Sequence, residues 1–143
     1  MIMITRIWQR VHEPRTISIL YFVSYLLLTG GGLAALADPP TSLEGEIGAT
    51  AMSMLATLLV IGGAIGSASA LPGVYWLERF AVGAIGSSAV IYLWIIVTLQ
   101  FTQSGNRLLQ AAFVVAVLAH QCIRWVRIRE RPYRPEDPTV AQA

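Results

Sequence analysis

The chain has 143 residues, of which 55% are apolar and only 13% are charged. A soluble domain normally carries about 25% charged residues, so this composition excludes an ordinary soluble domain and indicates a membrane protein. The net charge is only +2, and all ten basic residues are arginines gathered at a few places. Such clustering indicates orientation in a membrane rather than nucleic-acid binding. The single cysteine, Cys122, excludes an intramolecular disulfide and a paired-thiol redox site.

The N-terminal segment, residues 1–13, is predicted to be an amphipathic helix on the cytoplasmic side of the membrane. Its apolar residues recur at the spacing of one helical face: Ile4, Ile7, Trp8 and Val11. Arg6 and Arg10 fall on the other side of this helix. A helix with these two faces lies in the plane of an anionic leaflet. The alternative is a frayed cytoplasmic tail.

Four apolar stretches follow, and none contains Asp, Glu, Lys or Arg: Ile17–Ala37, Ile47–Leu71, Phe80–Phe101 and Leu108–Ile123. A bilayer core of about 30 Å takes about 20 residues of helix to cross, and the fourth stretch reaches that length only with the residues up to Ile128. We therefore predict an all-α, polytopic integral membrane protein. Its four transmembrane helices are expected to form an antiparallel bundle within residues 14–128, at about residues 16–37, 47–71, 78–101 and 107–126.

Hydroxyl groups follow one face of each of the first two predicted spans. In the first span they belong to Ser18, Tyr21, Tyr25 and Thr29, and in the second to Thr50, Ser53 and Thr57. Hydroxyls in lipid find partners across helix interfaces, where each bond contributes about 0.6 kcal/mol on average. This polar seam is therefore either an interhelical contact inside the bundle or a face that water wets.

One five-residue sequence occurs twice. Gly63-Ala64-Ile65-Gly66-Ser67 near the end of the second span recurs as Gly83-Ala84-Ile85-Gly86-Ser87 near the start of the third. Small residues four positions apart let helix backbones approach closely. The candidate helix-packing residues are therefore Gly62, Gly63, Gly66, Gly83, Gly86 and Ser87. The two copies either face each other inside one chain or offer surfaces to neighbouring chains.

The arginines predict the orientation of the chain. Nine of the ten precede the first span, lie between the second and third, or follow the fourth, whereas the loop 38–46 is acidic. Because short loops rich in arginine stay in the cytoplasm, we expect both termini on the cytoplasmic side of the bacterial inner membrane. The proline-containing tail, residues 129–143, is expected to be flexible. The predicted membrane-interface anchors are Trp8, Arg15, Trp76, Arg79, Arg124, Trp125 and Arg127.

The chemistry of a catalyst or coupled transporter is missing from this sequence. Transporters driven by protons or ions place ionisable groups inside the membrane, and the four apolar stretches have none. His12 and His120 are too few for a haem protein of this size, and no phosphate loop, metal-ligand spacing or nucleophile–base arrangement occurs. We therefore predict no catalytic residue, cofactor or metal. The expected partners are the lipid bilayer and either a second copy or another membrane protein, but not nucleic acid.

Several strings of residues at helix ends look familiar. They are His12-Glu13-Pro14-Arg15-Thr16, Asp38-Pro39-Pro40, Leu43-Glu44-Gly45, and Leu71-Pro72-Gly73 with Trp76 and Glu78-Arg79. Together they resemble small four-span membrane proteins of actinobacterial phages, several of which are described as holins or holin-like. The resemblance covers most of the chain but transfers no functional residue. It implies a phage-encoded protein that oligomerises in the cytoplasmic membrane and permeabilises it during lysis.

Two other functions fit the same features. One is a phage or prophage membrane protein that excludes superinfecting phage, or an accessory subunit of another membrane complex. The other is a minimal channel or transporter, which the absence of charges from the apolar stretches makes the weaker alternative.

Overall fold

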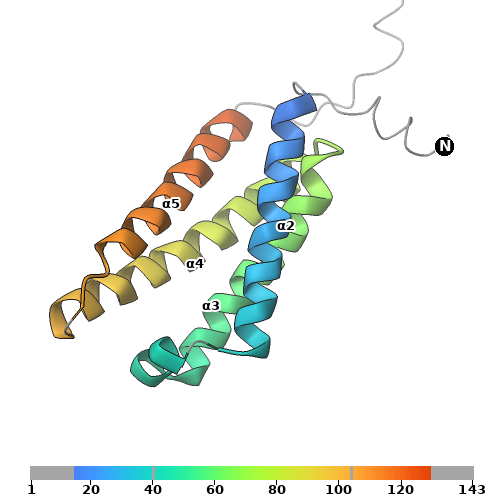
Figure 1. Ribbon diagram of the computed structural model, residues 1–143. Helices are drawn as coiled ribbons and strands as arrows, with labels where there is room; N and C mark the ends of the chain where they lie inside the picture. The colour runs from blue at the N-terminus through green and yellow to red at the C-terminus, as the bar shows by residue number, and fades with distance from the viewer. Residues whose placement is uncertain (1–14, 40, 104, 130–143) are drawn as a thin grey trace, which may run out of the picture.

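The computed structural model describes residues 15–39, 41–103 and 105–129, which form four helices. They are α2 (Arg15–Ala37), α3 (Thr41–Ala70), α4 (Tyr75–Thr102) and α5 (Leu108–Arg129), labelled in Figure 1. The predicted amphipathic segment, residues 1–13 with Trp8, and the predicted tail after Arg129 lie outside the described residues.

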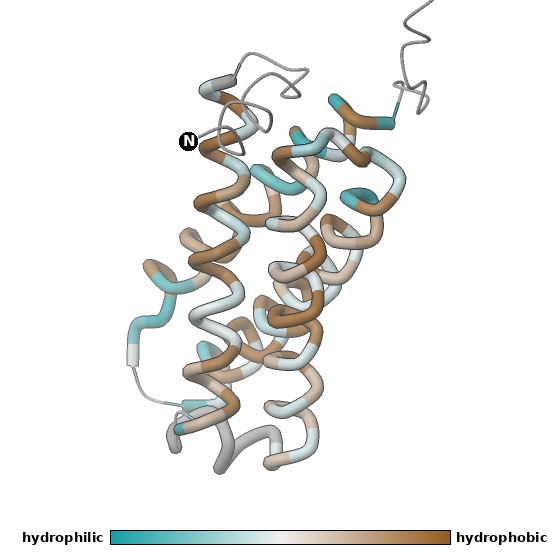
Figure 2. The backbone as a smooth tube through the Cα atoms, turned by 90° about the vertical axis from the view of Figure 1, so that its right-hand side faces the viewer, coloured by the Kyte–Doolittle hydropathy of each residue, from teal (hydrophilic) through white to brown (hydrophobic). Residues whose placement is uncertain are grey.

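All four helices are long and apolar enough to cross a membrane, which makes the chain a multi-pass membrane protein. The candidate spans are Thr16–Ala37, Gly48–Ala70, Tyr75–Thr102 and Leu108–Arg129. The predicted all-α architecture with four spans is thus confirmed, and the observed α4 and α5 extend beyond the charge-free stretches at the ends near Tyr75 and Arg129. Figure 2 shows apolar residues along most of each helix. The side of the membrane on which the termini lie stays a prediction.

Glycines shape two of the helix boundaries. Gly48 has a φ of 80° and a ψ of 152°, which interrupts α3 and separates its first turns from the span that begins there. Between α3 and α4, Gly73 has a φ of 72°, a left-handed conformation that glycine adopts without a steric penalty. The N–H groups of Gly73 and Val74 both donate to the carbonyl oxygen of Ser69 at 3.1 Å. This arrangement satisfies one of the free carbonyls at the end of α3.

Successive helices run in alternate directions and each packs against its neighbours in sequence. The starts of α2 and α4 and the ends of α3 and α5 therefore meet at one end of the molecule, which we call the Arg79 end. The opposite end is called the Asp38 end. In Figure 1 the pair α4–α5 leans away from the pair α2–α3 toward the Asp38 end. A cleft of about 330 Å³, lined mostly by apolar residues of all four helices, lies where the pairs separate.

Three apolar clusters hold the helices together. The one between α3 and α4 consists of Met52, Leu55, Ile95 and Leu99. A second cluster, toward the Arg79 end, consists of Tyr21, Tyr25, Ala70 and Ile85. The third joins α4 to α5 through Ala89, Ile96 and Val114. Many large apolar side chains point outward instead, such as Trp94 and Phe101, as expected where lipid rather than water is the solvent.

Candidate functional site

A buried ion pair joins α4 to α5 at the Arg79 end. Arg124 donates from Nε to Oε1 of Glu78 and from Nη2 to Oε2, each at 2.7 Å. Both side chains are fully buried in protein. Two parallel bonds between a guanidinium and a carboxylate form the strongest and most directional type of ion pair in proteins. The pair therefore fixes the relative position of these two helices.

Two tyrosines of α2 complete this cluster. The hydroxyl of Tyr25 donates to Oε1 of Glu78 at 3.0 Å, so the carboxylate holds α2 as well as α5. The guanidinium carbon of Arg124 lies 4.4 Å from the centre of the Tyr21 ring, a cation–π distance. The Tyr21 ring also contacts His120, with 4.7 Å between the centres of the two rings. We call these five residues, from α2, α4 and α5, the ionic cluster.

The helix termini favour charges of these signs at this place. Glu78 is in the first turn of α4, where the free N–H groups of the helix attract an anion. Arg124 precedes the last turn of α5, whose end attracts cations. Next to Glu78, Arg79 donates from Nη2 to the carbonyl oxygens of Ile128 and Arg129, each at 2.9 Å. Arg79 therefore caps the end of α5 from a neighbouring helix.

The ionic cluster has the chemistry of a structural clamp. The Glu78 carboxylate is occupied by Tyr25 and Arg124, and all three side chains are buried. In the part of the chain that the structure describes, no group of three or more His, Cys, Asp or Glu is placed to hold a metal ion. Removing one member of a buried ion pair typically costs about 3–5 kcal/mol, because the other charge is left without a partner. The cluster thus commits α2, α4 and α5 to one arrangement.

The interpretation of the spans as free of charge needs correction. The third charge-free stretch begins at Phe80 and the fourth ends at Ile123. In the structure α4 begins at Tyr75 and α5 continues to Arg129, so both helices include charged residues. Glu78 was absent from the predicted site, although it is the only acidic residue between Glu46 and Glu130. A single carboxylate at the arginine-rich end of the bundle was the signal that pointed to a buried ion pair.

The predicted polar seam separates into two parts with different surroundings. On α2, the side chains of Ser18, Tyr21 and Tyr25 are buried, and the Thr29 hydroxyl donates to the Tyr25 carbonyl at 2.8 Å. On α3, Thr50, Ser53 and Thr57 are exposed on the outside of the molecule and line a shallow groove with Ile91 of α4. The structure therefore brings the α2 residues into the bundle and leaves the α3 residues on its surface.

The first copy of the repeated sequence packs tightly against α2. A Cβ placed on Gly63 would lie 2.8 Å from the Tyr25 carbonyl oxygen, and one on Gly66 would lie 2.6 Å from Cγ of the Tyr25 ring. Gly62 meets α4 instead, where its Cβ would lie 2.8 Å from Ile85. Real Cβ atoms do not tolerate these separations, so glycine is required for α3 to receive both neighbours.

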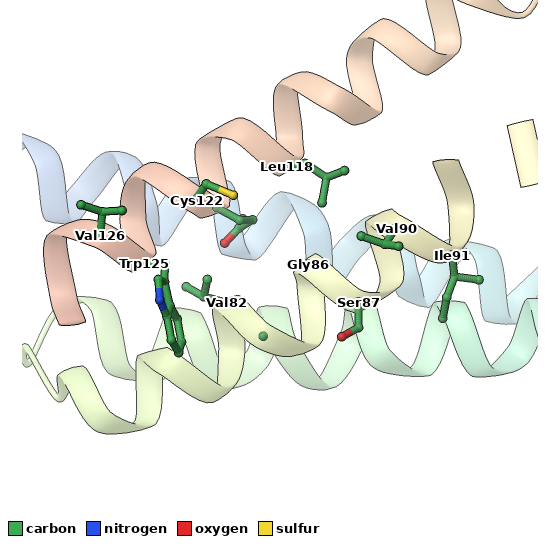
Figure 3. Close-up of a pocket in the computed structure, with 11 residues that line it drawn as sticks. Val82, Gly86, Ser87, Val90, Ile91, Leu118, Cys122, Trp125 and Val126 are labelled. Atoms are coloured by element: carbon green, nitrogen blue, oxygen red, sulfur yellow. The ribbon is translucent and has the colours of Figure 1, made fainter. Parts of the chain in front are cut away.

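The second copy has open space where the first has a helix. No atom lies within 4 Å of a Cβ placed on Gly83 or Gly86. Both glycines and Ser87 line a groove between α4 and α5, whose other wall includes Cys122 and Trp125 (Figure 3). We call this feature the α4–α5 groove. The first copy therefore packs against another helix of the chain, whereas the glycines of the second copy face open space.

The predicted membrane-interface anchors are distributed around the Arg79 end. Trp76, Trp125 and Arg127 are exposed, and the Trp76 ring packs edge to face with Phe80 at 6.4 Å. Arg15 opens α2, but its side chain is outside the description. Arg79 and Arg124 were predicted in the same role, and the structure adds protein partners for both. Their anchoring role stays a prediction.

Comparison with known proteins finds no matching family model, no matching curated protein and no matching solved structure.

Proposed function

We propose that the chain is a phage-encoded, holin-like membrane protein. It oligomerises in the bacterial cytoplasmic membrane, with both termini inside, and permeabilises that membrane during lysis. The resemblance of its helix-end sequences to phage membrane proteins supports this origin, and the four membrane-spanning helices supply the architecture that such a protein needs.

The observation that carries the proposal is the hydroxyl stripe on the outside of α3. Thr50, Ser53 and Thr57 are exposed, and the Ser53 hydroxyl donates to its own helix, at the Ala49 carbonyl. In a single chain this stripe faces lipid, which offers no polar partner. In an oligomer it faces either a neighbouring chain or a column of water. A permeabilising assembly therefore gives these three side chains a polar environment that an isolated chain lacks.

Regulated expression in a bacterial host tests the proposal. A cytoplasmic endolysin without its own export signal is co-expressed, and the membrane potential is followed with a voltage-sensitive dye. We expect abrupt loss of potential, followed by release of the endolysin and lysis. Continued growth with an intact potential, in cells whose membranes contain the protein, contradicts the proposal.

A triple variant examines the hydroxyl stripe itself. Thr50→Val, Ser53→Ala and Thr57→Val together remove the hydroxyls with little change in shape, and we expect delayed or abolished loss of potential. Thr98→Val is the matched control, because the Thr98 hydroxyl is also exposed and also donates to its own helix, at Trp94. The control is expected to behave like the wild type. Equal timing in the triple variant and the wild type excludes a role for the stripe.

The ionic cluster favours a second candidate, a non-enzymatic subunit that excludes superinfecting phage or accompanies another membrane complex. Three helices clamped through Glu78 form a defined scaffold without requiring a membrane lesion. This function predicts that expression protects the host from infecting phage while the membrane potential stays intact. Plaque counts and dye fluorescence from the same cultures separate the two candidates.

A further inference from the structure

The α4–α5 groove is an unoccupied version of a contact that the chain makes elsewhere. On α3, the first copy of the repeated sequence receives α2 so closely that no side chain fits at Gly63 or Gly66. On α4, the second copy presents Gly83 and Gly86 with nothing within 4 Å of either Cβ position. The same five-residue sequence therefore packs against a neighbouring helix on α3 and lines an open groove on α4, which Figure 3 shows.

A buried polar atom beneath the wall of this groove lacks a partner. Gln121 of α5 lines the groove and is only 3% exposed. Its Oε1 is buried and accepts no hydrogen bond from any residue that the structure describes. An amide oxygen without a donor is strongly unfavourable at membrane depth, and lipid chains cannot supply a donor. The groove therefore calls for an occupant that brings an N–H or O–H group.

We infer that the α4–α5 groove binds a second copy of this chain, with α4 of each copy seated in the groove of the other. In a contact with two-fold symmetry both copies use the same surface, and each residue pair occurs twice with the copies exchanged. That surface must therefore carry both a donor and an acceptor. The groove does so, since Ser87 on α4 offers a hydroxyl and the Gln121 side chain on α5, once it turns out of its buried position in the single chain, offers its oxygen. Each Ser87 donates to Gln121 of the other copy, while Gly83 and Gly86 allow the close helix approach.

The inference rests on the proposed function in one respect, that copies of the chain meet in the bilayer. Its test is independent of permeabilisation and uses the native Cys122, which is exposed and lines the groove. The full chain in lipid vesicles is treated with a short bis-maleimide, which joins two thiols. We expect cross-linked dimers of the wild type. A Cys122→Ala, Leu27→Cys variant moves the thiol to an exposed position on α2 outside the groove and is expected to give few dimers.

Two variants block the groove without disturbing the single chain. Gly86→Leu fills open space, and Gln121→Leu removes the partnerless oxygen. We expect each to reduce Cys122 cross-linking at least tenfold while helix content and thermal stability stay close to wild type. Gly30→Leu is the matched control, because Gly30 on α2 also has nothing within 4 Å of its Cβ position, and it is expected to cross-link like the wild type.

Each result bears on one proposal or the other. Undiminished cross-linking in both groove variants, or a wild type that stays monomeric in vesicles, overturns the inference. Dimers that depend on Gly86 and Gln121, in a chain that leaves the membrane potential intact, support the groove and contradict the holin-like function. Loss of potential without groove-dependent dimers supports the holin-like function and contradicts the inference about the groove.

Discussion

The ring of Tyr25 lies directly on Gly66, where a Cβ atom would come within 2.6 Å of the ring's Cγ. The same tyrosine donates its hydroxyl to Glu78. Because Gly66 has no side chain, the Tyr25 ring of α2 packs against α3 at the position from which its hydroxyl reaches Glu78 of α4. Close helix packing and buried charge are parts of one arrangement at the Arg79 end.

Replacement of Gly66 by leucine is expected to damage the fold. The new side chain occupies the place of the Tyr25 ring, and overpacking of this kind typically costs about 1–3 kcal/mol or more. Thermal unfolding in mild detergent measures the loss. The comparison is Gly86→Leu, which meets open space and is expected to unfold near the wild-type temperature. Equal stability of the two variants contradicts the different packing of the two copies.

Single replacements in the ion pair are expected to be more harmful than a double replacement. Glu78→Leu leaves Arg124 buried without its carboxylate, and Arg124→Met leaves the carboxylate without its cation, at a cost of about 3–5 kcal/mol each. With both changes together no charge remains, and we expect stability within about 1–2 kcal/mol of the wild type. A double-mutant cycle from unfolding in mixed detergents provides the coupling energy. Additive effects show that the pair is not coupled.

Tyr25→Phe keeps the ring on Gly66 but removes the hydroxyl that donates to Glu78. A hydrogen bond to a charged group contributes about 1.5–3 kcal/mol, and we expect a loss of stability of that size. Tyr92→Phe is the control, because its hydroxyl accepts a bond from the neutral amide of Gln110, where about 1 kcal/mol is expected. A smaller loss at Tyr25 than at Tyr92 contradicts the charged character of the Glu78 site.

Arg79→Met is expected to fray the end of α5. The Arg79 side chain donates to two carbonyl oxygens there, and an uncapped last turn opens more readily. Hydrogen exchange followed by mass spectrometry should show faster exchange in the peptide that contains residues 124–129, with the exchange of α2 and α3 unchanged. Arg79→Lys retains a donor and is expected to fall between the two. Unaltered exchange in Arg79→Met shows that the cap has no role in holding this turn.

The spans were predictable from sequence because hydropathy and length are local properties, and the observed helices match the predicted spans within a few residues at every end. At the Arg79 end α4 and α5 continue past the charge-free stretches, since Glu78 and Arg124 neutralise each other inside the protein. Periodicity grouped Ser18, Tyr21 and Tyr25 on one face, but it gave no sign of which neighbour that face meets. The repeated sequence likewise indicated two sites of close helix packing, but not that the second contacts no helix of the same chain.

The divergence of the two helix pairs has a mechanical consequence. Among the described helices, the Cα atoms of α2 and α5 do not approach within 8 Å, yet their side chains meet where Tyr21 contacts His120 and Arg124. The ionic cluster thus joins α2 to α5 at one end. Farther along, the α4–α5 hairpin is held to α3 by the apolar cluster of Met52, Leu55, Ile95 and Leu99 and by the hydrogen bond from the Ser88 hydroxyl to the Leu55 carbonyl. A force that tilts the hairpin in the bilayer would therefore act first on these contacts, and the four-helix cleft would change width before the ionic cluster changed its geometry.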